Sequence, residues 1–388
     1  GSAKKSDMNR LTPPTDHDYI VLGIGGVGSA ALYHLAKRGA DVLGIDQYPA
    51  GHDKGSSHGD SRLIRLVYFE HPDYVPLLRS AFELWRALEV DSGDELLKMT
   101  GLLQAGPAEG EVITGLLKAA QIHNLKMEQL TSEAANRRFP GINLKAEQTA
   151  IFDENAGILK VEDCVKTHVK LAQQHGAQLK SGHAIGWEQE KNRISVSLGE
   201  ETLYCQKLVI TPGAWAGDLL PELNPFLEIR RKTMFWFDKH LPQHQLSNNF
   251  PVFFVEDEGH NFYGFPAMDK KGVKMADHQG GEVISSPAEL GDSLDASALL
   301  NTVGALAQYL PDVGDHLAHY TNCMYTMSRD EHFIVGQYPS SANVHFVAGL
   351  SGHGFKFATV LGQIMADLSM TGKTQHPISF LDPDRFQI

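Results

Sequence analysis

Six residues near the amino end, Gly23-Ile24-Gly25-Gly26-Val27-Gly28, constrain the fold of this chain more than any other segment. They follow a short apolar run, Tyr19 to Leu22, and precede a segment whose apolar residues have helical spacing until Gly39. A second apolar run, Val42 to Ile45, comes next. The order strand, tight turn, helix, strand predicts a βαβ unit with buried parallel strands.

The spacing of these glycines fits the G-x-G-x-x-G turn that binds dinucleotides. Gly23 permits the tight turn, Gly25 with its neighbour Gly26 lets a pyrophosphate approach, and Gly28 lets the helix pack on the strand. The helix N-terminus then offers N–H groups and a positive dipole to the phosphates. Asp46 stands 18 positions after Gly28, where a ribose hydroxyl needs an acceptor. The acid favours FAD or NAD over NADP, and the turn does not choose between those two.

Length and charge limit the class of protein. The chain has 388 residues, of which 42% are hydrophobic, so we expect two domains. Its formal net charge is −13 and it has no basic block, which argues against nucleic acid and anionic membranes as partners. No apolar run is long enough to span a bilayer.

The cysteines and the chain ends indicate the compartment. Cys164, Cys205 and Cys323 match neither a paired metal site nor a disulfide framework, so we expect no metal and a reducing environment. Gly1-Ser2-Ala3 resembles a cloning remnant rather than a signal peptide, and the final residues, Arg385 to Ile388, match no targeting address. The expected location is the cytoplasm.

Later segments resemble further pieces of the same sheet. Lys207 to Ile210 leads into a glycine turn and a helix expected near Ala214, and Val344 to Val347 precedes a helix expected from Ala358 to Leu368. Segments such as Lys232 to Phe237 alternate like strands of a mixed or antiparallel sheet. We therefore predict an α/β fold of mixed α+β character with a discontinuous cofactor domain, residues 18–96, 158–226 and 325–388. The second domain is expected over residues 97–157 and 227–324.

Four further segments have distinctive sequences. The first is Gly55-Ser56-Ser57-His58-Gly59-Asp60-Ser61-Arg62-Leu63-Ile64-Arg65. The others are Phe262-Tyr263-Gly264-Phe265-Pro266 with Lys274 and His278, Cys323-Met324-Tyr325-Thr326, and Gly349 to Phe357. All four resemble segments of one known family, that of monomeric sarcosine oxidase and N-methyltryptophan oxidase, which places the first beside its flavin ring. The similarity runs from about Tyr19 to the end of the chain. It implies a glutathione-reductase-like FAD domain joined to a mixed-sheet substrate domain, in a monomer.

The resemblance implies FAD bound covalently, through a thioether from Cys323 to the 8α-methyl group. Without the resemblance, a buried free thiol is the usual state of a cysteine, and that interpretation stays for Cys164 and Cys205. The expected cofactor-binding residues are Gly23, Gly25, Gly26, Gly28, Asp46, Ser57, Ser61, Arg62, Gly213, Trp215, Cys323, Met324, Gly352, Gly354, Phe355 and Lys356.

The same resemblance implies a set of catalytic residues: Lys274, His278, Arg65, Tyr263, His353, Lys356 and Tyr325. Arg65 and Lys356 match the family's anchors for the substrate carboxylate, a role that suits a planar guanidinium and a compact ammonium. If the stretch is helical, Arg65 lies one turn from Arg62. Tyr263, His278 and His353 resemble polar residues on the substrate side, where histidine can change its charge near working pH.

Lys274 matches the lysine that the family places opposite the substrate, where a fixed charge speeds the reaction of reduced flavin with oxygen. Its apolar neighbours Val273 and Met275 have strand-like spacing, which favours burial, whereas Lys270 and Lys271 are expected in solvent. We expect no role for the histidines His168, His183 and His345.

The chain also departs from the family. Ser57-His58 stands where two adjacent histidines are usual, and Gly336 where an acid is common.

The expected reaction is oxidation of an N-methyl amino acid by O₂ to the amino acid, formaldehyde and hydrogen peroxide. Three alternatives stay open: oxidation of a cyclic amino acid such as proline or pipecolate, an NAD-dependent dehydrogenase, and a flavoprotein that binds without turnover.

Overall fold

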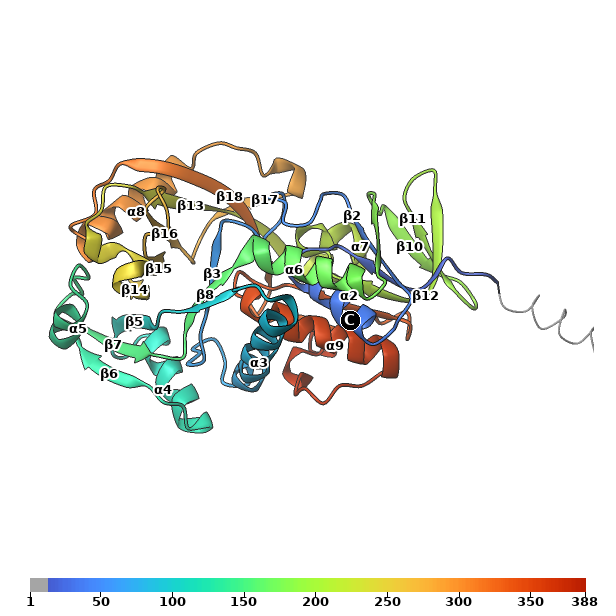
Figure 1. The fold of residues 1–388 in the computed structure, drawn as a ribbon, viewed down its shortest axis with the longest axis horizontal. Coiled ribbons are helices and arrows are strands. Elements are labelled where there is room, and N and C mark those ends of the chain that lie inside the picture. Colours follow the sequence, from blue (N-terminus) through green and yellow to red (C-terminus); the bar gives the residue numbers. More distant parts are fainter. Residues whose placement is uncertain (1–12) are drawn as a thin grey trace, which may run out of the picture.

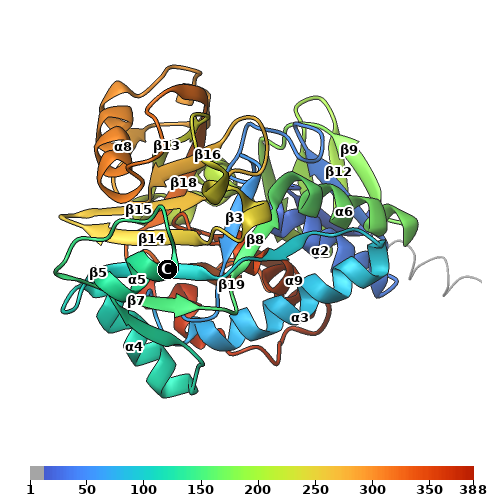
Figure 2. The same ribbon diagram turned by 60° about the vertical axis from the view of Figure 1, so that its left-hand side comes forward.

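The computed structural model describes residues 13–388, drawn in Figures 1 and 2, so the expectation for Gly1-Ser2-Ala3 lies outside the described residues. The α-helices are α2 (Gly26–Lys37), α3 (Tyr74–Ser92), α4 (Glu111–His123), α5 (Ser132–Arg138), α6 (Val161–Gln174), α7 (Ala216–Leu219), α8 (Ala296–Tyr309) and α9 (Ala358–Thr371). The strands are β1 (His17–Leu22), β2 (Val42–Asp46), β3 (Ser61–Ile64), β4 (Leu97–Met99), β5 (Leu102–Pro107), β6 (Glu128–Thr131), β7 (Gln148–Asp153), β8 (Gly157–Lys160), β9 (Gln178–Ser181), β10 (Gly186–Gln189), β11 (Ile194–Ser197), β12 (Thr202–Ile210), β13 (Leu227–Phe237), β14 (Val252–Asp257), β15 (His260–Phe265), β16 (Val273–Asp277), β17 (Glu282–Ile284), β18 (Leu317–Ser328), β19 (Ile334–Gln337) and β20 (Val344–Ala348).

The first sheet has the order β10-β11-β12-β1-β2-β9, with β20 beside β12 and β19 beside β20. Strand β1 is parallel to β2, with Tyr19 opposite Val42, and is parallel to β12 on its other side. The pairs β2–β9 and β12–β20 are also parallel. The predicted βαβ unit is therefore confirmed, and the later segments expected in the same sheet do belong to it.

Helices cover one face of this sheet, and their apolar side chains pack with those of the strands in one core. Figure 1 shows α2, α6 and α9 together against the strands, with α3 next to α9. Helices α2 and α9 approach so closely that a Cβ at Gly362 would come within 2.5 Å of the Ala30 Cβ. On the opposite face, Trp187, Leu223 and Phe346 belong to a second apolar cluster.

The second sheet runs β17-β13-β16-β15-β14-β5-β7-β6, with β18 paired to β13. It is mixed, as expected: β5 and β14 are parallel, whereas β13, β16, β15 and β14 form antiparallel neighbours. Residues of α8 and α5 pack in one core with it and residues of α4 in another. The antiparallel pair β13–β18 places Lys232 opposite Cys323. Both sheets thus combine in the α/β fold of mixed character that the sequence predicts, while the proposed domain boundaries stay a prediction.

A small third sheet, β3-β8-β4, lies between the two large ones in Figure 2. Arg62 lies in strand β3 and Arg65 just beyond it, so the helical spacing considered for these two arginines is wrong. The helix expected to begin near Ala214 is present as a 3-10 turn at Gly213–Trp215 that leads into the single turn of α7.

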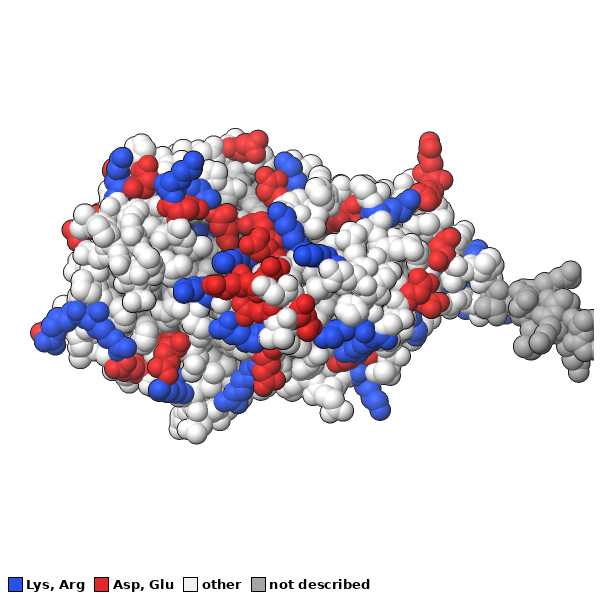
Figure 3. Space-filling view, in the orientation of Figure 1, with Lys and Arg blue, Asp and Glu red and all other residues white. Residues whose placement is uncertain are grey.

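No helix within residues 13–388 is long and apolar enough to cross a membrane. On the face shown in Figure 3, lysine and arginine side chains are scattered among aspartate and glutamate, and a group of acidic side chains lies near the middle of the molecule.

Candidate active site

One elongated cavity joins the first sheet to the second, with about 1900 Å³ of empty space including its mouth. It begins at the C-terminal ends of β1, β2 and β12 and reaches residues of β14, β15 and β18. Most of the predicted site residues line it: Gly23, Gly25, Gly26, Gly28, Asp46, Ser57, Arg62, Arg65, Gly213, Trp215, Tyr263, His278, Met324, Tyr325, Gly352, His353, Gly354, Phe355 and Lys356. Ser61, Lys274 and Cys323 are buried and do not line it.

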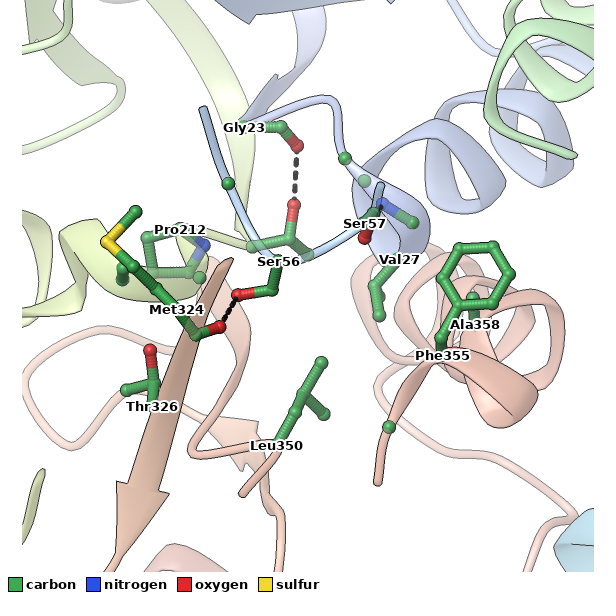
Figure 4. Close-up of a pocket in the computed structure, with 18 of the residues that line it drawn as sticks. Gly23, Val27, Ser56, Ser57, Pro212, Met324, Thr326, Leu350, Phe355 and Ala358 are labelled. Atoms are coloured by element: carbon green, nitrogen blue, oxygen red, sulfur yellow. Dashed lines mark hydrogen bonds between the residues drawn. The ribbon is translucent and has the colours of Figure 1, made fainter. Parts of the chain in front are cut away.

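The glycine turn has the geometry that requires glycine. Gly23 has a φ of +87°, and a Cβ there would lie 2.3 Å from the Thr211 carbonyl oxygen. At Gly28 a Cβ would lie 1.7 Å from the Gly23 carbonyl oxygen. The Thr211 hydroxyl donates to that same carbonyl at 2.7 Å, the upper dashed line in Figure 4. The turn therefore leaves open backbone at the start of α2, where the residue before the helix, Gly25, has no side chain that could cap it.

Asp46 ends β2 beside this turn. Its carboxylate accepts hydrogen bonds from the backbone N–H groups of Ile24 (2.7 Å) and Tyr48 (3.0 Å), and His52 lies 3.8 Å away. Burial raises its pKa, but these contacts outweigh burial and hold the pKa below its usual range, so Asp46 is an acceptor. Tyr48, His52 and His183 also line this end of the cavity. Sequence reasoning missed the first two as lining residues, and the expectation that His183 has no role stays a prediction although this residue lines the cavity.

The segment at residues 55–57 crosses the cavity between the turn and β18 (Figure 4). The Ser57 hydroxyl accepts from the Gly26 N–H at 3.2 Å. The hydroxyl of Ser56, a residue that sequence reasoning missed, donates to the Met324 carbonyl, the lower dashed line in Figure 4. These two bonds hold the segment next to Cys323, the residue before Met324.

Arg65 forms a buried cationic site in the deeper part of the cavity. Its guanidinium donates to Glu70 at 2.7 Å and to Gln104 at 2.5 Å, and it lies over the Tyr68 ring, 4.6 Å from the centroid. Its Nε and the second Glu70 oxygen are buried without a partner. Glu70 was missed by sequence reasoning, because residues 65–70 form no helix or strand and a spacing of five residues there predicts no contact.

Lys356 is a second cationic side chain near the Tyr68 ring. Its ammonium lies 5.2 Å from the Tyr68 centroid and donates to the His353 carbonyl oxygen at 2.9 Å. Burial, followed by the charge of Arg65, lowers the pKa of Lys356 to about 7. Both ring nitrogens of His353 are engaged: Nε2 donates to the Glu331 carbonyl oxygen at 2.9 Å and Nδ1 accepts from the Tyr68 hydroxyl at 2.5 Å. Two buried cationic side chains therefore lie near one ring with a single carboxylate, Glu70, paired to Arg65, and this excess of positive charge would favour a bound anion.

Polar and aromatic side chains of the second sheet face these cations. The rings of His278 and Tyr325 lie 5.7 Å apart, and those of His278 and Phe254 6.2 Å apart. Burial lowers the pKa of His278 to about 3, and the charge of Lys232 adds to the effect, so His278 is neutral near pH 7. Burial raises the pKa of Tyr263 to about 12, so this tyrosine keeps its proton.

Lys274 is buried in β16, as its apolar neighbours predicted, and only 2% of it is exposed. Its ammonium donates to the carbonyl oxygens of Gly59 (2.9 Å) and Ser61 (2.8 Å) and lies 4.7 Å from the Phe265 centroid. Burial lowers its pKa, and the Arg62 charge lowers it further. Lys270 is exposed, as expected, whereas Lys271 is only partly exposed and pairs with Asp60 at 2.5 Å, a contact that the sequence did not indicate.

Cys323 lies 1% exposed in an apolar cluster with Met234, Trp236 and Tyr325. Burial raises the pKa of its thiol, while the positive charges of Arg62, Lys274 and Lys232 act against that effect. The thiol is therefore held in a cationic environment one residue from the cavity wall.

Comparison of the sequence with known families and proteins identifies the family of this chain. The sequence model of the family described as FAD dependent oxidoreductase matches residues 18–368, most of the chain. The chain belongs to this family. Among its relatives, it is 37% identical to monomeric sarcosine oxidase of Streptomyces avermitilis, over 95% of this chain and 97% of the relative. It is 35% identical to N-methyl-L-tryptophan oxidase of Citrobacter koseri, over 91% and 94%.

Solved structures share the fold of this FAD-dependent oxidoreductase. A mutant of NikD, described as an unusual amino acid oxidase, superposes with a TM-score of 0.84 at 22% identity, over 95% of this chain and 97% of that one. L-proline dehydrogenase from P. horikoshii superposes with a TM-score of 0.82 at 21% identity, over 97% and 99%. The resemblance seen in the sequence motifs and the expected fold class are both confirmed.

The residues present fit FAD. The open turn at Gly23 and Gly28, the start of α2 and the acceptor Asp46 all line the dinucleotide end of the cavity, where phosphates and a ribose would bind. From there the cavity continues past Ser57 and Met324 to the cations, which leaves a path for the rest of the cofactor.

The charge state of Lys356 leads to a pH prediction. In the free protein its pKa is about 7, and a bound anion favours the ammonium, so the complex has the higher pKa. The affinity for a simple carboxylate without an amine should therefore be full below pH 7 and weaken above it. The loss should approach about tenfold per pH unit until the pKa of the complex is reached. Calorimetric titration with acetate from pH 6 to 9 measures it, and a flat profile in the unaltered protein would contradict the assignment. Lys356→Met is the control that should be flat.

Proposed function

We propose that this FAD-dependent oxidoreductase oxidises a small N-methyl amino acid, with O₂ as the electron acceptor, to the amino acid, formaldehyde and hydrogen peroxide. We further propose that FAD is bound through a thioether to Cys323, and that the protein acts as a cytoplasmic monomer. The names of the sarcosine and N-methyltryptophan oxidases that it resembles support this substrate class.

The observation that carries the proposal is the pair of buried cations over one aromatic ring. Arg65 and Lys356 lie 4.6 Å and 5.2 Å from the Tyr68 centroid, and Glu70 supplies a single negative charge beside them. The unpartnered Arg65 Nε leaves a donor for another group. A substrate carboxylate would complete this arrangement, because a guanidinium and an ammonium both bind carboxylates through charge-assisted hydrogen bonds.

The other side chains would then orient and protect the amine. When bound, FAD would accept two electrons from the carbon next to the amine nitrogen. Anchoring the carboxylate fixes the distance of that carbon from the cofactor, which turns binding energy into orientation. Neutral His278 adds no cation that would repel a substrate ammonium, and it can accept a hydrogen bond from the amine. The rings of Phe254, Tyr263 and Tyr325 exclude water.

Oxidation of a cyclic secondary amino acid is the second candidate, because the same anchors and rings would hold proline or pipecolate, and L-proline dehydrogenase shares the fold. A panel of sarcosine, other N-methyl amino acids, proline and pipecolate separates the two. The proposed reaction releases one formaldehyde for each hydrogen peroxide. Peroxide without formaldehyde, obtained only from the cyclic substrates, would reject the N-methyl proposal in favour of the alternative.

The cofactor bond is tested by Cys323→Ala. We expect the unaltered protein to stay yellow in an acid-precipitated pellet, because a thioether survives denaturation. The flavin of the Cys323→Ala protein should instead pass to the supernatant, as absorbance near 450 nm would show. Cys205→Ala, a buried thiol of the first sheet, is the matched control and should keep a yellow pellet. Flavin retained by the denatured Cys323→Ala protein would assign the bond to another residue.

A further inference from the structure

The turn at residues 59–61 receives the Lys274 ammonium, and its backbone is strained. Lys274 donates to three oxygens of the turn: the carbonyl of Gly59 and both the carbonyl and hydroxyl of Ser61, at 2.9, 2.8 and 3.2 Å. Between these two residues Asp60 has a φ of +70°. A residue with a Cβ rarely adopts this left-handed conformation unless its surroundings hold it there.

Glu162 is one group that holds it. Both carboxylate oxygens of Glu162 accept from the Asp60 N–H, at 3.1 and 3.2 Å. Glu162 lies in the first turn of α6, where the helix dipole favours a negative charge. The neighbouring N–H of Val161 donates to the Asp60 carbonyl oxygen at 3.2 Å. The start of α6 therefore binds both sides of the strained residue.

Lys271 is the other group. Its ammonium pairs with the Asp60 carboxylate at 2.5 Å and lies 5.7 Å from the Trp236 centroid. Lys274 lies 5.5 Å from the same ring. Lys271 precedes Lys274 by three residues, in the connection between β15 and β16. The pair therefore links the strand that carries Lys274 to the turn that receives it. The side chains of Lys271 and Asp60 are 29% and 40% exposed, so this contact is weaker than the buried bonds of Lys274.

We propose that Glu162, Asp60 and Lys271 are positioning residues for Lys274, because they hold the turn whose oxygens fix its ammonium. The proposal rests on the proposed function, and on the role that the family resemblance implies for Lys274, which is to speed the reaction of reduced flavin with oxygen. It adds that the direction of the ammonium is set by α6 and by the β15–β16 connection. A lysine released from this turn would keep its charge but lose its fixed position, and preorganisation is what makes such a charge effective.

The test compares Glu162→Ala with Glu162→Gln, which keeps an oxygen that can accept from the Asp60 N–H. In stopped-flow experiments, Glu162→Ala should slow flavin reoxidation by about tenfold or more, and change anaerobic reduction by less than about twofold. Glu162→Gln should keep most of the reoxidation rate. Asp163→Ala, at the exposed next position, is the matched control and should match the unaltered protein. Equal losses in Glu162→Ala and Glu162→Gln, or a parallel loss of both half-reactions, would overturn the proposal.

Lys271 is tested in the same way, with a smaller expected effect because its contact with Asp60 is partly exposed. Lys271→Met should slow reoxidation by about threefold, whereas Lys271→Arg should restore it, since arginine can still pair with a carboxylate. Lys270→Met removes the neighbouring exposed charge and should change neither rate. Loss in Lys270→Met equal to that in Lys271→Met would mean that the general charge of this connection matters, and would overturn the role of Lys271.

Hydrogen–deuterium exchange measures whether Glu162 holds the turn at residues 59–61, and it does so without catalytic turnover. In Glu162→Ala, exchange should rise in the peptides that contain residues 59–62 and 272–276, and it should rise in neither with Asp163→Ala. Unchanged exchange in both peptides would overturn the positioning role. Raised exchange, combined with a Lys274→Met protein that reacts normally with oxygen, would instead keep the positioning role and reject the oxygen role of Lys274.

Discussion

Replacing Lys274 by methionine should slow reoxidation of the reduced flavin by on the order of 10²–10³-fold, which is the usual loss for one preorganised electrostatic group. Methionine keeps most of the apolar stem and removes the charge. The ammonium is buried and held by the oxygens of Gly59 and Ser61, so it is fixed while negative charge develops on oxygen. Anaerobic reduction by substrate should change little.

Stopped-flow measurement of the two half-reactions decides the role of Lys274. Slow reduction with normal reoxidation would place the lysine on the substrate side of the cofactor. Normal rates in both steps would leave it a structural lysine. Lys270→Met, in an exposed position of the same connection, is the matched control and should leave both steps unchanged.

Removing the Arg65 guanidinium should raise the apparent KM for an amino-acid substrate at least about tenfold, because a charge-assisted hydrogen bond is worth about 1.5–3 kcal/mol. Arg65→Met keeps an apolar side chain over the Tyr68 ring, but it also leaves Glu70 as a buried carboxylate without its cation. The double variant Arg65→Met/Glu70→Gln removes that complication and should show the same selectivity.

The comparison that isolates anchoring uses an uncharged amine such as N-methylbenzylamine, which has no carboxylate. Its KM should change far less than that of an amino acid in both variants. Arg79→Met, at an exposed position of α3, is the control and should affect neither substrate. Equal losses for the two substrates would show that Arg65 supports the fold or the cofactor rather than the carboxylate.

The features that could be predicted from the sequence are those set by interactions between residues close together in the chain. The βαβ unit was predictable because the glycine spacing at Gly23 and Gly28 is imposed by contacts of 2.3 Å or less that any Cβ would make. The burial of Lys274 was predictable because Val273 and Met275 alternate with it in a strand, although its charge suggested the surface. Both depend on residues close together in the chain.

The parts that sequence missed depend on distant segments that meet. Lys271 is paired because Asp60, the residue directly before β3, contacts the connection between β15 and β16. His183 lines the cavity because the segment after β9 lies at the edge of the first sheet beside β2. No local pattern carries these contacts.

An anaerobic titration followed by admission of oxygen tests the central claim most directly. One equivalent of sarcosine or another N-methyl amino acid should bleach the flavin absorbance near 450 nm without oxygen. Air should then restore the absorbance, with one hydrogen peroxide and one formaldehyde formed for each flavin. Bleaching by NADH, and by no secondary amino acid, would contradict the proposal and favour a pyridine-nucleotide-dependent enzyme.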